Sequence, residues 1–72
     1  MERYHITKRS DGKWDAKLEN AGKASKTCAT QSEAIEYARR YLSGKDEGGI
    51  ILVHGANTTE QSVPGRINRV TR

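Results

Sequence analysis

Few residues of this chain have side chains that could do chemistry, and those residues are scattered. The side chains of His5, His54 and Cys28 are of types that can ligate a transition metal. No Cys-x-x-Cys or His-x-x-x-His spacing occurs, however. We therefore predict no metal site and no cofactor. We expect Cys28 to pack as a small apolar residue and His54 to be a hydrogen-bonded residue at a strand end.

Catalysis has as little support in the sequence. A nucleophile needs a neighbouring base and a third group that orients the base, and no arrangement here specifies them. The glycine-rich residues 44–49 lack the Gly-Lys-Ser/Thr ending of a phosphate-binding loop. The sequence thus predicts a protein that is not an enzyme, with no catalytic residue and no small-molecule substrate.

Basic and hydroxyl side chains offer a different chemistry, the binding of duplex nucleic acid. The chain has 72 residues and a net charge of +4. Lys and Arg on a sheet can hold phosphates while neighbouring side chains probe base edges. Strand alternation that turns Trp14 inward places basic and hydroxyl residues on the outer face. The predicted nucleic-acid contacts on this face are His5, Thr7, Arg9, Lys13, Lys17 and Thr27. Arg66 and Arg69 belong to a C-terminal segment that could follow the phosphate backbone as an arm. The alternative is an ordinary solvated sheet face.

Three short strands must position these side chains. Residues 4–8 and 13–19 alternate between apolar and polar types, and residues 25–29 form a weaker edge strand. Asp11-Gly12 suits the tight hairpin turn between the first two strands. We expect Trp14 to be the main anchor of the core.

The start of a helix is the clearest local signal. Thr30 and Glu33 predict a capping box, in which Glu33 accepts a hydrogen bond from the Thr30 amide. Apolar residues at helical spacing between residues 34 and 42 predict a stripe that faces the sheet. Gly44 predicts a left-handed cap at the end of the helix.

The apolar run at residues 50–53 shows no alternation, which is typical of a strand covered on both faces. The helix can cover one face, and the C-terminal segment or a second chain can cover the other. Small chains with few apolar residues often gain stability by self-association. We therefore hypothesise a homodimer with Ile50 and Leu52 at its interface.

The predicted fold class is α+β. A three-stranded antiparallel meander carries one helix packed on it, and an apolar fourth strand follows. That strand is parallel to its sheet neighbour if both lie in one sheet, and it could instead pair with a second chain. We place the β-β-β-α-β core at residues 1–55. Residues 56–72 form a second region, in which residues 56–62 are a polar loop and residues 66–70 are either a short fifth strand or a basic tail.

The location that the sequence favours is the cytoplasm. The first residues lack the apolar segment of a signal peptide, and no apolar run approaches the roughly 20 residues that cross a bilayer. A lone cysteine suits a reducing compartment. We expect no membrane partner.

Several short motifs together resemble a known family. They are Tyr4-His5, Asp11-Gly12-Lys13-Trp14 with Lys17, Thr30-Gln31-Ser32-Glu33-Ala34-Ile35, His54-Gly55 and Gly65-Arg66-Ile67. This set is similar to the small prokaryotic domain of unknown function 2188 (DUF2188), although residues 56–64 are inserted between the last two motifs. The resemblance implies a fold and a bacterial or phage setting, and no established activity.

A looser similarity joins the chain to AP2-like domains, including the arm-binding N-terminal domains of phage-type integrases. Those domains also carry Gly-Lys-Trp on a strand and start a helix with Thr-x-x-Glu-Ala. Their helix backs the sheet, and the open side of the sheet lies in the DNA major groove. The resemblance implies a small basic binding module for nucleic acid. The alternative is a protein-interaction or homo-oligomeric assembly module with no nucleic-acid role.

Overall fold

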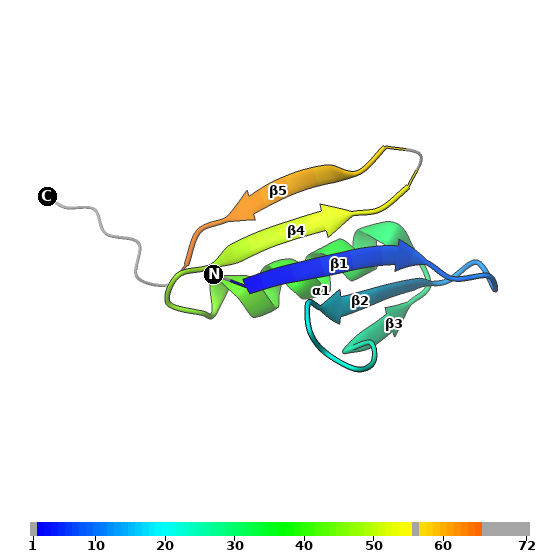
Figure 1. Ribbon diagram of the computed structural model, residues 1–72, viewed down its shortest axis with the longest axis horizontal. Helices are drawn as coiled ribbons and strands as arrows, with labels where there is room; N and C mark the ends of the chain where they lie inside the picture. Colours follow the sequence, from blue (N-terminus) through cyan, green and yellow to red (C-terminus); the bar gives the residue numbers. More distant parts are fainter. Residues whose placement is uncertain (1, 56, 66–72) are drawn as a thin grey trace, which may run out of the picture.

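The structure, a computed structural model, describes residues 2–55 and 57–65. Its elements are β1 (Glu2–Lys8), β2 (Trp14–Leu18), β3 (Lys26–Cys28), α1 (Gln31–Ser43), β4 (Gly49–Val53) and β5 (Thr59–Val63). Figure 1 shows α1 lying across one face of the sheet. Among these residues no element covers the opposite face. No helix in the two described ranges is long and apolar enough to cross a membrane.

The strands form one mixed sheet in the order β3-β2-β1-β4-β5. The β1, β2 and β3 strands are antiparallel neighbours, whereas β4 pairs parallel to β1 and antiparallel to β5. The α+β class and the parallel placement of the fourth strand are confirmed. The predicted meander is present as β3-β2-β1, but it is one part of a five-stranded mixed sheet that also contains β4 and β5.

The polar segment after β4 corrects the sequence prediction most clearly. We predicted a loop at residues 56–62, but Thr59–Val63 is the edge strand β5. An edge strand needs few apolar residues, because much of its surface faces water. Val63, which is 4% exposed, supplies its inward apolar contact. The sheet therefore continues beyond residue 55, and the alternatives for residues 66–70 lie outside the described residues.

The core lies between α1 and the inner face of the sheet. Its largest fully buried side chains are Tyr4, Ile6, Leu42 and Ile51. Trp14 is half-buried and packs against the rim of this core, so the prediction that it is the main anchor is wrong. Tyr4 is instead the aromatic side chain that is fully buried in the described core, and burial raises the pKa of its phenol.

The two ends of α1 differ in detail from the predicted caps. The Glu33 amide donates to Thr30 Oγ1 at 3.2 Å, as a capping box requires. The Glu33 carboxylate accepts from the Ala29 amide at 3.2 Å rather than from Thr30. Gly44 ends the helix with φ −85°, in the right-handed region, so the predicted left-handed cap is wrong.

Candidate binding face of the sheet

The sheet face opposite α1, which we call the open face, carries the functional candidates. Because Tyr4 and Ile6 point into the core, their neighbours on β1 point outward. The strand register sets the outward residues in three rows. From β3 or β2 towards β5 these rows are Thr27–Asp15–Thr7–His54, Lys17–His5–Leu52–Glu60 and Glu19–Arg3–Ile50–Ser62.

A hydrogen-bonded chain crosses the middle of the open face, and we call it the histidine chain. His5 Nδ1 lies 2.7 Å from His54 Nε2, and His5 Nε2 lies 3.0 Å from Glu19 Oε1. The two imidazole rings are nearly parallel, with centroids 5.0 Å apart. An ion pair extends the chain to Arg3, whose Nη1 lies 3.6 Å from Glu19 Oε2.

These contacts assign the histidine tautomers. An ionised carboxylate only accepts hydrogen bonds, so His5 Nε2 carries a proton and donates to Glu19. His5 Nδ1 in the neutral ring is then an acceptor, and His54 Nε2 donates to it. In the neutral ring of His54, Nδ1 is then an acceptor at the end of the chain.

Backbone pairing brings the two histidines together although 49 positions separate them in sequence. The His54 amide donates to the Ile6 carbonyl at 2.9 Å, which continues the parallel pairing of β1 and β4. The prediction that His54 is a hydrogen-bonded strand-end residue is confirmed. Its partner His5 was missed, because no local signal in the sequence specifies which strand lies beside β1.

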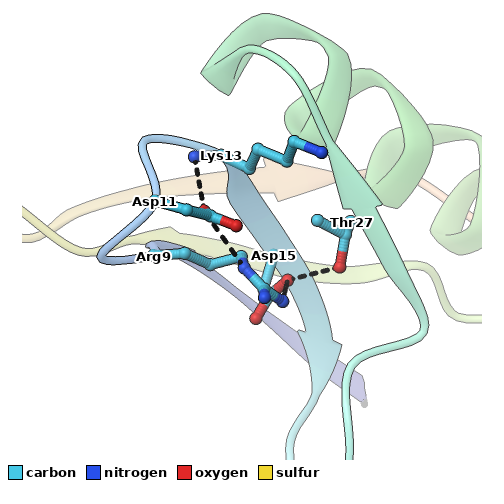
Figure 2. Close-up of polar contacts among 5 residues, drawn as sticks. All are labelled: Arg9, Asp11, Lys13, Asp15 and Thr27. Carbon is cyan, nitrogen blue, oxygen red and sulfur yellow. Dashed lines mark hydrogen bonds and ion pairs between the residues drawn. The ribbon is translucent and has the colours of Figure 1, made fainter.

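A second polar group lies at the β1–β2 turn, and we call it the hairpin cluster. Figure 2 shows Arg9 reaching both carboxylates, with Nε 3.3 Å from Asp11 Oδ1 and Nη1 3.4 Å from Asp15 Oδ1. Thr27 Oγ1 donates to Asp15 Oδ1 at 2.7 Å. The backbone amide of Lys13 donates to Asp11 Oδ1 at 3.0 Å. This amide, assisted by the Arg9 charge, lowers the pKa of Asp11.

Several of the predicted nucleic-acid residues already have partners within the molecule. Arg9 and Thr27 are held by carboxylates, and His5 is held by Glu19 and His54. The side chain of Lys13 extends away from Asp11 and Asp15 in Figure 2. Thr7 and Lys17 lie on the open face as expected, whereas Arg66 and Arg69 lie outside the described residues.

The pairing of carboxylates with the predicted cations of the open face is the feature that sequence reasoning missed. Asp15 and Glu19 stand beside the predicted cations, and Glu60 joins them from β5. The alternation of β2 already placed Asp15 outward, so this signal was present. Glu60 could not be placed, because its segment reads as a loop.

Two apolar residues, Ile50 and Leu52, also point outward, and we call them the apolar pair. Both are half-buried, whereas Ile51 between them and Val53 after them face the core. Arg3 and His5 stand beside them on β1, and Ser62 and Glu60 stand beside them on β5. The helix thus covers one side of β4, and the apolar pair lies on the other.

The described part of the open face has no cluster with enough ligand side chains to hold a metal ion. Within residues 2–55 and 57–65, no three or more His, Cys, Asp or Glu side chains gather in a way that would hold a metal ion. Cys28 faces the core and is 7% exposed, and its burial raises the pKa of the thiol.

Fold and face together define a small α+β protein with one helix behind an open-faced mixed sheet in the described part of the chain. A family model described as "Uncharacterized protein conserved in bacteria (DUF2188)" matches residues 4–62, and the chain belongs to this family. The match includes both residues of the His5–His54 contact and most of β5. No curated protein and no solved structure matches the chain.

Proposed function

We propose that this chain is a non-enzymatic protein-binding module that docks through the β1, β4 and β5 part of its open face. The apolar pair carries the proposal. Ile50 and Leu52 point away from the core on a sheet face that no described element covers. Burying such side chains against a partner contributes about 25 cal/mol per Å² of apolar surface.

The surroundings of the apolar pair suit a protein partner. Glu60 and Ser62 flank the pair on one side, and Arg3 and His5 flank it on the other. An apolar centre with a polar rim is the usual anatomy of a protein–protein interface. The histidine chain adds a flat pair of rings whose polar atoms are mostly satisfied within the molecule.

The test is affinity capture from bacterial extract with the wild type and with Leu52→Glu. Ser32→Glu is the matched control, because Ser32 is exposed in the first turn of α1, away from the open face. We expect the wild type and the control to retain the same protein and Leu52→Glu to lose it. Equal capture by all three would contradict the proposal.

Duplex nucleic acid is the second candidate partner. The observation that favours it is Lys17, which is exposed on the open face and has no ion pair among the described residues. The Arg3 and Arg9 guanidinium groups have carboxylate partners, which weakens their attraction for phosphate. For this reason we rank the nucleic-acid role second.

Titration with duplex DNA separates the two candidates. If DNA binds this face, the amide signals of Thr7, Lys13 and Lys17 should shift at low salt and return as salt rises. No shift at low salt, where attraction to phosphate is strongest, would eliminate the nucleic-acid role.

A further inference from the structure

We infer that the partner on the open face is a second copy of this chain, stacked sheet to sheet. This inference rests on the proposed function. The two copies are related by a two-fold axis that runs parallel to the strands, between β1 and β4. This arrangement is supported by the charges of the open faces, which are complementary between the two copies.

The middle row shows the complementarity best. It reads Lys17, His5, Leu52, Glu60 across β2, β1, β4 and β5. A two-fold axis between β1 and β4 reverses this order in the facing sheet. Lys17 then faces Glu60 of the second copy, and His5 faces Leu52 of the second copy. Both contacts occur twice, as an isologous interface requires.

The outer rows agree with the same axis. Glu19 faces Ser62 of the second copy, and Arg3 faces Ile50 of the second copy. Asp15 faces the position before β5, where Thr58 stands. The acidic groups of the outer rows, Asp15 and Glu19, therefore meet hydroxyl groups, and no two like charges face one another in the three rows.

The other two-fold axis, perpendicular to the strands through the middle row, fails on charge. It would place Lys17 on Lys17 and Glu60 on Glu60 of the second copy. It would also place Asp15 of one copy against Glu19 of the second copy. Like charges in apposition disfavour such a complex, so the pattern selects the axis parallel to the strands.

The distances fit sheet packing. Stacked sheets lie about 10 Å apart, and an extended Lys and Glu can meet across that gap. Within one copy, Lys17 on β2 and Glu60 on β5 stand three strand spacings apart, which is roughly 14 Å at about 4.8 Å per spacing. Both residues are exposed. The β3 strand lies beyond the facing β5 and takes no part.

Charge reversal tests this arrangement, with association measured by sedimentation. We expect the wild type to dimerise, and Lys17→Glu and Glu60→Lys each to weaken the dimer about tenfold or more. Mixing the two single variants should restore association, because each copy then supplies the charge that the other lacks. The double variant should also restore it. Circular dichroism checks that each variant is folded.

The inference is wrong if the wild type stays monomeric at several hundred micromolar, or if the single variants associate as well as the wild type. It is also wrong if weakened single variants do not recover on mixing. These results are separable from a failure of the proposed function. A monomeric wild type whose captured partner is lost in Leu52→Glu would keep protein binding and eliminate the second copy.

Discussion

The hairpin cluster and the apolar pair lie on the same open face, but they differ in how many of their side chains are available to bind a partner. In the hairpin cluster, Arg9 is paired with Asp11 and Asp15, and Thr27 donates to Asp15. In the apolar pair, Ile50 and Leu52 are half-buried, and no described element lies above them. A charged residue on a surface is therefore available to a ligand only in so far as its neighbours leave it unpaired.

The largest expected effect is a difference in stability between variants of two glycines. One glycine lies in the turn of the hairpin cluster, and the other precedes the strand that carries the apolar pair. Gly12 in the β1–β2 turn and Gly48 before β4 both have positive φ, +89° and +69°. A Cβ at Gly12 would meet nothing within 4 Å, whereas a Cβ at Gly48 would collide with the backbone of Val63 and Gly65.

Gly12→Ala should lower the free energy of unfolding by about 1 kcal/mol, which is the cost of the left-handed conformation. Gly48→Ala should lower it by about 3 kcal/mol or more, because the end of β5 must also move. Urea denaturation of both variants measures the difference. Equal losses would mean that β5 does not pack closely against the α1–β4 turn.

The association of the two copies should respond to one part of the open face and not to the other. Leu52→Glu should weaken association by about 2 kcal/mol or more, roughly 30-fold, because it places a carboxylate in the apolar centre. Thr27→Glu adds the same charge on β3, outside the proposed contact, and should leave the dissociation constant unchanged. Sedimentation equilibrium compares them. Similar weakening in both would remove the distinction between the two regions.

The histidine chain makes a spectroscopic prediction. When both rings are neutral, His5 and His54 should each carry the ring proton on Nε2. Long-range ¹H–¹⁵N spectra distinguish the two tautomers of each ring. Glu19→Gln should disturb the His5 signals first, since Glu19 holds that ring directly at 3.0 Å. An Nδ1–H tautomer on either ring in the wild type would contradict the assigned chain.

The smallest expected effect is the acid titration of Asp11. Its lowered pKa means that the ionised carboxylate favours the folded state above the unfolded pKa. This contribution is lost as the pH falls through the folded pKa. An NMR titration should give a midpoint below the ordinary value. Arg9→Gln should leave it low, because the Lys13 amide is the larger cause. A full return to the ordinary value would assign the shift to Arg9 instead.

Local features of the fold were predictable from the sequence, whereas long-range pairings were not. The Asp11-Gly12 turn, the Thr30 cap and the inward face of β1 each follow from residues close in sequence. The place of β5 does not, because its polar residues resemble a loop and its pairing with β4 fixes it.

The candidate face shows the same limit. Strand alternation predicts Lys17 on the outer side of the sheet, and the unbroken apolar run of β4 predicts that Leu52 needs a cover on that side. The contact between His5 and His54 depends on which strand lies beside β1, which no nearby residue encodes. The pairing of Arg9 with Asp15 was open to prediction, since alternation turns both side chains to the outer face.

The most direct test of the account is an isotope-filtered NOE experiment on a mixture of labelled and unlabelled wild-type chain. Because it detects contacts only between different copies, it ignores the neighbouring His5 and Leu52 within one chain. The account predicts cross-peaks from the Leu52 methyl groups of one copy to the His5 ring of the other. Cross-peaks that arise from α1 instead, or no cross-peaks at a concentration of several hundred micromolar, would contradict it.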